Sequence, residues 1–156
     1  MTFFPGAPAM RRLFAALALG LAADAATAAD RVYLEPAEFV AAAFPGATPQ
    51  VHVLWVTPEL RAEVLRILGH EPAQLRQKYW SDGQRTAWIL EEIGKEDPIT
   101  AGFVVREGRI EQARVLVYRE SRGGEIRYPS FVAQFQGAAL ADGGYLNKQI
   151  DRKSVV

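Results

Sequence analysis

The chain has 156 residues, its 18 basic and 18 acidic side chains cancel, and it contains no cysteine. This length suits one compact domain with a single hydrophobic core. The zero balance argues against broad electrostatic capture of nucleic acid, which requires a basic surface to neutralise phosphates. Without cysteine the chain has no disulfide, no thiolate metal site and no thiol nucleophile.

The N-terminal segment has the three regions of a secretory signal peptide. Arg11 and Arg12 precede a Leu/Ala-rich run, and small residues follow as far as Ala28. We therefore expect residues 1–28 to be a signal peptide, cleaved after Ala28, and the mature protein to be periplasmic or otherwise extracytoplasmic. A membrane anchor is the alternative, but the apolar run is shorter than the roughly 20 residues of a span, and Asp24 interrupts its end.

Two helices are expected in the first half of the mature chain. Pro36 suits the first turn of one helix, and Pro45-Gly46 stops it. The other helix begins at Thr57, a good N-cap residue, and ends at Gly69. Its apolar residues recur at helical spacing and form one stripe, made of Leu60, Val64, Leu65 and Leu68.

Strand patterns occupy the rest of the first half and the centre of the chain. Residues 50–56 alternate, with Val51, Val53 and Trp55 on one face, which predicts a half-buried strand. Four more runs are rich in β-branched and aromatic residues: 76–81, 86–93, 99–106 and 109–118. Turn signals at Asp82-Gly83 and Glu107-Gly108 separate neighbouring runs, so we expect an antiparallel sheet.

The remainder of the chain reads as loops around one short helix. Residues 121–124 form a glycine-bearing loop, 129–136 a short helix with Phe131 and Phe135 on one side, and Gly143-Gly144 a turn. The pattern predicts a single α+β domain, an antiparallel sheet with helices packed on it. Its three tryptophans, Trp55, Trp80 and Trp88, are expected in the core.

Few residues suggest catalysis or metal binding. His52 and His70 lie in different predicted elements, with no carboxylate at ligand spacing, so we interpret both as surface or packing residues. Glu91 and Glu92 are adjacent on a predicted strand and point to opposite faces, so they do not form an acid–base pair. A small hydrolase is therefore the least favoured function, because no nucleophile, base and orienting group can be assembled.

The most informative stretch is 115–126, where a buried strand runs into a charged, glycine-bearing loop. By composition it is only a hairpin turn with solubilising charges. Its order of residues, however, resembles the FMN-binding domain family, which includes the flavoprotein subunits of sodium-pumping and Rnf-type electron-transport complexes. In that family a strand ends in an aromatic or histidine residue, followed by a glutamate and a short glycine loop against the flavin. Tyr118, Glu120, Gly123 and Gly124 fall on those places.

The resemblance covers roughly residues 33–150, and its specificity comes from the order and spacing of short motifs. Matching segments are 33–36, 44–46, 86–88, 99–102 and 131–137. It implies an FMN site bordered by Glu120 and the Gly123-Gly124 backbone. Ser121 belongs to the same loop, and Tyr118 and Tyr128 are candidates for packing beside the cofactor.

The resemblance ends after Ile150-Asp151, where the family continues into a Ser-Gly-Ala-Thr segment whose threonine can carry FMN through a phosphoester bond. Here Arg152 to Val156 follow instead. Residues 151–156 match one reading frame of a common sequencing-library adapter, so we expect a non-native tail after an FMN-binding domain at 29–150 that is incomplete at its C-terminus. If the domain is incomplete, the attachment threonine would lie beyond the end of this chain. A natural basic tail is the alternative.

The resemblance implies an exported flavoprotein that carries electrons, rather than a stand-alone enzyme. Its expected partners are redox proteins at the membrane or in the periplasm, and a flavin transferase in the full-length protein. Nucleic acid is not expected as a partner. The rival hypothesis is an exported binding module without a redox cofactor, whose loop 119–127 holds a protein or an anionic ligand.

Overall fold

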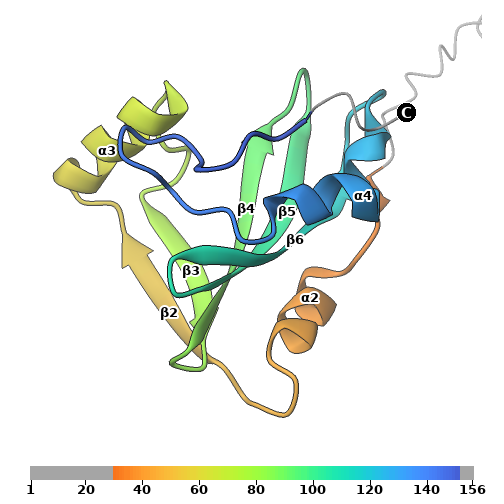
Figure 1. The fold of residues 1–156 in the computed structure, drawn as a ribbon, viewed down its shortest axis with the longest axis horizontal. Helices are drawn as coiled ribbons and strands as arrows, with labels where there is room; N and C mark the ends of the chain where they lie inside the picture. The colour runs from red at the N-terminus through yellow and green to blue at the C-terminus, as the bar shows by residue number, and fades with distance from the viewer. Residues whose placement is uncertain (1–29, 152–156) are drawn as a thin grey trace, which may run out of the picture.

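A six-stranded antiparallel sheet forms the centre of the computed structural model, which describes residues 30–151 (Figure 1). The strand order across the sheet is β1-β6-β5-β4-β3-β2. This confirms the expected α+β class with an antiparallel sheet. The elements, in chain order, are β1 (Arg31–Val32), α2 (Pro36–Ala43), β2 (Gln50–Trp55), α3 (Pro58–Leu68), β3 (Arg76–Ser81), β4 (Arg85–Ile93), β5 (Pro98–Arg106), β6 (Arg109–Tyr118), the 3-10 turn η1 (Gly124–Arg127), α4 (Pro129–Val132) and the 3-10 turn η2 (Ala133–Phe135).

The expected signal peptide, residues 1–28, lies outside the described residues, as does the expected tail beyond Asp151. Within residues 30–151, no helix has the length and apolar character needed to cross a membrane.

The turns between strands follow the local sequence signals. Glu107 and Gly108 both have positive φ, 52° and 72°, as a two-residue hairpin between right-twisted strands requires. At the β3–β4 turn the Asp82 carboxylate accepts hydrogen bonds from the backbone N–H groups of Gln84 and Arg85, at 2.9 and 2.7 Å. The four central strands consequently begin and end within one residue of their predicted limits.

The helices also begin and end where their capping residues predict. Thr57 Oγ1 accepts a hydrogen bond from the Leu60 N–H at 3.3 Å, which satisfies one free donor at the start of α3. At the other end, Gly69 has φ 79° and its N–H donates to the Leu65 carbonyl. Pro36 occupies the first turn of α2, as expected.

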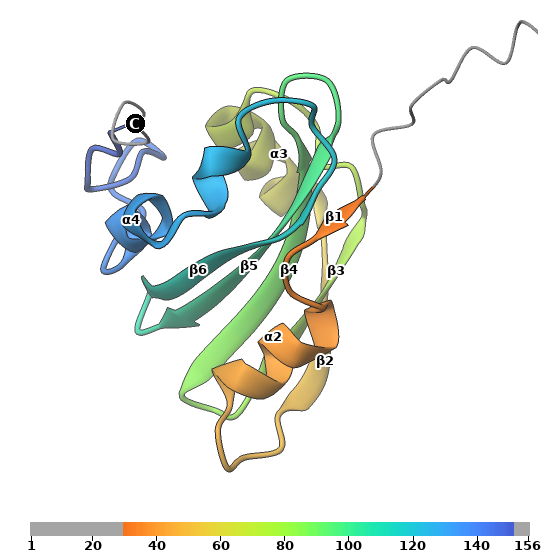
Figure 2. The same cartoon turned by 90° about the vertical axis from the view of Figure 1, so that its right-hand side faces the viewer.

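The core lies between α2 and the centre of the sheet. Phe39, only 1% exposed, places its ring directly over the backbone of Gly102 on β5. A Cβ atom at Gly102 would lie 2.6 Å from this ring, so only glycine permits the approach. Around the pair lie the other buried members of the core, Ala43, Phe44, Ala87, Val104, Leu116 and Val117. Figure 2 shows α2 lying against this part of the sheet.

The outer part of the sheet is not buried, contrary to the prediction from the sequence. Val51, Val53 and Trp55 share one face of β2, as expected, but they are 57%, 46% and 64% exposed. The reason is that α2 packs on β4 and β5, the two middle strands of the sheet, rather than on β2 at its edge. The expectation of a core residue is therefore wrong for Trp55, whereas Trp80 and Trp88 are half-buried. Helix α3 likewise has no buried residue despite its apolar stripe.

The segment after β6 covers the other long edge of the sheet. Ile110 of β6 exchanges backbone hydrogen bonds with this segment, donating to Ala138 and accepting from Gly137 at 2.8 and 2.7 Å. The chain then crosses to α3, where Arg66 Nη1 donates to the Gly143 carbonyl at 2.8 Å (Figure 1). The helix predicted over 129–136 is instead divided into α4 and the 3-10 turn η2. Phe131 of α4 and Phe135 of η2 pack edge to face, with ring centroids 5.8 Å apart.

The contact between Phe39 and Gly102 gives a test of the fold. We expect Gly102→Ala to lower the free energy of unfolding by about 1–3 kcal/mol, because the added methyl group meets a buried ring that has no room to move. Phe39→Leu removes part of that ring, so the double variant should lose less stability than the sum of the single variants, by about 1 kcal/mol. Urea unfolding followed by circular dichroism measures all three, and strictly additive losses would show that the two residues do not oppose each other.

Candidate functional site

The candidate site is the loop that follows β6, residues 119–128, which lies at the end of the sheet where β1 pairs with β6 (Figure 2). Tyr118, the last residue of β6, is buried, whereas Ser121, Arg122 and Gly123 are exposed. The sequence therefore changes from core to surface within a few residues. Two charged side chains, Arg119 and Glu120, determine how the loop leaves the sheet.

The Glu120 carboxylate holds the β4–β5 turn. Although acidic, this residue is only 6% exposed, and its Oε1 accepts hydrogen bonds from the backbone N–H groups of Lys95, Glu96 and Asp97. The donors of Glu96 and Asp97 lie at 2.7 and 3.1 Å. A Cβ atom at Gly94 would lie 2.6 Å from the same oxygen, so the turn approaches the carboxylate because it carries glycine there.

These hydrogen bonds set the protonation of Glu120. The backbone N–H of Glu96 contributes most to lowering the pKa of the Glu120 carboxyl below its ordinary value, and the N–H groups of Asp97 and Lys95 act in the same direction. Burial alone would raise the pKa of this carboxyl, but the hydrogen bonds lower it by more. Glu120 is therefore a carboxylate at neutral pH, fully engaged by the turn on one of its oxygens.

Arg119 makes the second connection between the loop and the sheet. Its guanidinium donates to Thr100 Oγ1 at 3.1 Å and to the Pro98 carbonyl at 3.3 Å, both on β5. It also lies 3.4 Å from a carboxylate oxygen of Glu91 and 3.2 Å from one of Asp30. These two neighbouring residues of the loop therefore bind different partners. Arg119 binds the sheet, and Glu120 binds the β4–β5 turn.

Tyr118 closes the base of the loop from inside. Its hydroxyl donates a hydrogen bond to the Arg122 carbonyl, and its ring stacks on Tyr33 with centroids 6.4 Å apart. Burial, with a further contribution from the nearby Glu120 charge, raises the pKa of the Tyr118 phenol. Tyr118 is therefore a neutral hydrogen-bond donor that supports the loop from below.

The exposed part of the loop combines glycine backbone, a cation and two aromatic rings. Gly123 adopts the left-handed conformation with φ 83°. The Arg127 guanidinium carbon lies 4.8 Å from the ring centre of Tyr33 and 4.9 Å from that of Tyr128. Arg127 Nη1 donates to the Tyr33 hydroxyl at 3.2 Å and to the Gly124 carbonyl at 3.1 Å. The arrangement presents a positive, partly aromatic surface next to exposed backbone.

The structure gathers the residues predicted from the sequence into this one loop but separates their tasks. Tyr118 and Glu120 support the loop, and Tyr128 contacts Arg127. Ser121 and Gly123 are exposed, whereas Gly124 is half-buried. Tyr33 and Arg127 were not among the predicted cofactor-binding residues, although Arg127 lies in the loop 119–127 that the rival hypothesis gave to an anionic ligand. No local signal could have shown them, because they are 94 residues apart along the chain.

A separate cleft lies between α2, the sheet and α4, with a volume of ≈ 540 Å³. Apolar side chains such as Ala43, Val104 and Val132 line it together with the polar Gln112 and Arg114. One wall carries an ion pair in which Arg85 Nε lies 2.9 Å from Glu111 Oε2. None of the site residues predicted from the sequence lines this cleft.

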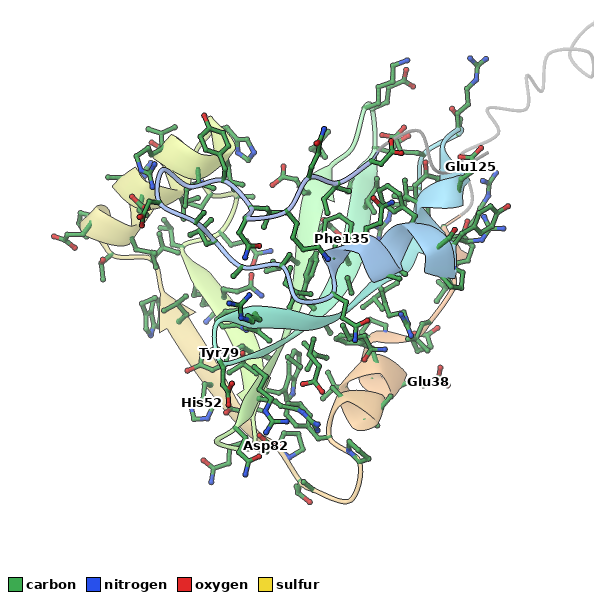
Figure 3. The ribbon with its side chains drawn as sticks, viewed as in Figure 1. Glu38, His52, Tyr79, Asp82, Glu125 and Phe135 are labelled. Carbon is green, nitrogen blue, oxygen red and sulfur yellow. The ribbon has the colours of Figure 1, made fainter. Side chains whose placement is uncertain are left out.

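The other titratable residues show no catalytic grouping within residues 30–151. Glu91 accepts from Thr100 Oγ1, whereas Glu92 on the opposite face lies 3.3 Å from His70, so the predicted separation of the two carboxylates is confirmed. His52 stacks on Tyr79 with ring centroids 5.1 Å apart (Figure 3). In the described part of the chain, no three histidine, aspartate or glutamate side chains are grouped so that they could bind a metal ion.

Comparison with known proteins gives no match for this chain: no protein-family model, no curated protein and no solved structure is significantly similar to it.

The hydrogen bonds of Glu120 predict a pH-dependent contribution to stability. We expect Glu120→Gln to lower the unfolding temperature at pH 7, because an amide lacks the charge that the three N–H donors stabilise. Since the folded pKa is lowered, the wild-type advantage should be complete above about pH 4.3 and should disappear as the pH falls through the folded pKa. Thermal unfolding of both proteins across this range measures the difference.

Glu96→Gln is the matched control, since Glu96 lies on the same turn but its side chain is exposed. An equal loss in both variants, or a difference that persists at low pH, would contradict the role given to Glu120.

Proposed function

We propose that this protein is an exported FMN-binding flavoprotein domain that carries electrons outside the cytoplasmic membrane. The order and spacing of its motifs, from Tyr33 to Ile150, support the resemblance to that family. The signal-peptide pattern of residues 1–28 supports export. Redox proteins at the membrane or in the periplasm are the proposed partners.

The observation that carries the proposal is the juxtaposition of Arg127, Tyr33, Tyr128 and the Gly123-Gly124 backbone. FMN has a phosphate and a flat ring system. A guanidinium suits the phosphate because its N–H donors are held in a fixed plane, and tyrosine faces suit the ring. Both observed hydrogen bonds of Arg127 use Nη1, and a guanidinium has five N–H donors, so it can still donate to a phosphate.

Glycine in the loop fits such a ligand sterically. A Cβ atom at Gly124 would lie 3.1 Å from Arg127 Nη1 and 3.6 Å from the Tyr33 hydroxyl, so a larger residue would occupy the space between backbone and cation. At Gly123 the left-handed φ disfavours any side chain. In the proposed site Gly123, Gly124, Ser121 and Tyr128 border the cofactor, while Tyr118 and Glu120 position the loop.

The bound flavin would supply the redox chemistry, and the protein would set its position and potential through nearby hydrogen bonds and charge. The residues of this chain then need only bind and orient the cofactor. Arg127 and Arg122 would compensate the phosphate charge. The loop would be held in place by Arg119 on the sheet and by Glu120 on the β4–β5 turn.

The noncovalent site is tested by titrating the purified chain with FMN and following flavin fluorescence and visible absorption. We expect Gly124→Val to weaken FMN binding at least about tenfold, because the new side chain displaces Arg127, and Gly123→Val to act in the same direction through its backbone. Gly83→Val is the control, since Gly83 also has positive φ, 91°, but lies in the distant β3–β4 turn.

Equal FMN affinity in all three variants would refute the site. A folded wild-type chain that takes up no flavin at all would instead favour the rival function, a binding module without a cofactor.

Covalent attachment has its own test. The resemblance places the attachment threonine after an isoleucine–aspartate pair, where this chain has Arg152 to Val156. Thr86 and Thr100 do not substitute for it, because the Thr86 hydroxyl accepts from Trp88 Nε1 and the buried Thr100 hydroxyl donates to Glu91. Coexpressed with a flavin transferase, the chain should show no flavin fluorescence on a denaturing gel. A version with the family's continuation after Ile150 should fluoresce, and equal fluorescence in both would place the attachment elsewhere.

A further inference from the structure

Strand β2 is an open edge of the sheet. It is the last strand in the order β1-β6-β5-β4-β3-β2, and within residues 30–151 no segment pairs with its outer side. In Figure 1 it forms the margin of the sheet, with α3 beyond its C-terminal end rather than along its edge. The opposite edge differs, because β1 and the segment around Ala138 pair with β6.

The register with β3 determines which backbone groups of β2 point outward. The Val56 N–H donates to the Leu75 carbonyl at 2.9 Å, so this directly opposed pair is a hydrogen-bonded one. In an antiparallel ladder such pairs alternate with pairs whose backbone groups point away. Counting back along the register, the N–H and C=O groups of Trp55, Val53 and Val51 face outward. Among residues 30–151 they have no strand partner, so they form a row of donors and acceptors available to another strand.

The same three residues carry the exposed apolar side chains of β2. The strand reads Gln-Val-His-Val-Leu-Trp and contains no charged residue and no proline. Natural edge strands are usually protected from pairing by charge, proline, a bulge or very short length. β2 has none of these protections, so nothing in the strand itself prevents antiparallel pairing with another β2 strand.

We propose that β2 pairs antiparallel with β2 of a second copy of this chain, about a two-fold axis at Val53. Val53 then lies opposite the partner's Val53, and Val51 opposite the partner's Trp55. Each of the three residue pairs is of the hydrogen-bonded kind and makes two hydrogen bonds, so every outward group of Val51, Val53 and Trp55 is satisfied. The two sheets join into one.

The strand is complementary to itself, which is why a second copy is the occupant. On the exposed face a small Val51 side chain meets a large Trp55 ring at both ends, with two valines at the centre. The nearest cation, Lys78, lies on β3 opposite Val53. Two Lys78 side chains would be separated by three strand spacings, about 14 Å, which exceeds the screening length of about 8–10 Å. The zero net charge of the chain adds no long-range repulsion.

The size of the contact sets its strength. One pair of short strands buries less than the roughly 1,200 Å² of a standard interface, so we expect a reversible dimer with a dissociation constant on the order of micromolar. The candidate flavin loop lies away from this edge: Figure 3 shows Glu125 at the opposite side of the molecule from His52 of β2. Dimerisation and cofactor binding are therefore separable in experiment.

Single cysteines test the register, because the chain has none of its own. Opposed residues of a hydrogen-bonded pair have Cα atoms about 5.5 Å apart, within the range a disulfide spans. Val53→Cys should therefore form a disulfide-linked dimer under mild oxidation with glutathione disulfide. Val51 is even more exposed than Val53, 57% against 46%, but two copies of Val51→Cys would lie about four residues, or 13 Å, apart along the strands and should not cross-link. The double variant V51C/W55C should cross-link.

Cross-linking of Val51→Cys as readily as Val53→Cys, or of neither variant, would overturn the proposed pairing.

Sedimentation equilibrium of the full chain without added flavin tests the association itself. Val53→Lys should raise the dissociation constant at least tenfold, because it places two charges at the axis, while an unchanged circular dichroism spectrum shows that the exposed substitution leaves the fold intact. Leu65→Lys on α3 is the control, since Leu65 is 41% exposed and also apolar. A wild-type chain that stays monomeric at high micromolar concentration, or equal weakening by both substitutions, would refute the proposal.

Discussion

The ring of Phe39 against the backbone of Gly102 is the contact on which the rest of this structure depends. It brings α2 onto the centre of the sheet, and Ala43, Phe44, Val104 and Leu116 are buried around it. A protein interior is close-packed, so a ring can lie this near to a strand only where the strand has no Cβ atom. The small core that results lies on one face of the sheet, next to β4 and β5. The loop after β6, β2 and α3 lie outside this core.

Two regions show what happens beyond the reach of that core. At one end of the sheet, polar contacts hold the loop after β6. The buried Glu120 carboxylate accepts from three backbone N–H groups, Arg119 contacts β4 and β5, and the Tyr118 hydroxyl donates to the loop from below. A buried polar group stabilises a structure only when its partners are in place, so these contacts fix the loop in one conformation. At the other end, β2 and α3 carry apolar residues that remain exposed.

The roles of the site residues follow from this division. Glu120 was expected to border a cofactor, and the structure gives it a task within the fold, because Oε1 already accepts the N–H groups of the β4–β5 turn. The surface that faces outward is instead made by Arg127 between two tyrosines, beside glycine backbone. The proposed FMN site uses this surface rather than the cleft beside α2, whose lining mixes apolar and charged side chains.

The sequence by itself determined the strands, helices and turns, because these depend on neighbouring residues: the β-branched and aromatic runs of β3 to β6, the Thr57 and Gly69 caps, and the glycines of the tight turns. It also predicted that Val51, Val53 and Trp55 share a face and that residues 121–124 form a loop after a strand ending at Tyr118. Only the tertiary structure decided which faces are buried, because burial depends on where α2 packs rather than on the pattern of β2. It alone also joined Tyr33 to Arg127 and Glu120 to the turn at 95–97, since contacts between residues far apart in the chain leave no periodic signal in the sequence.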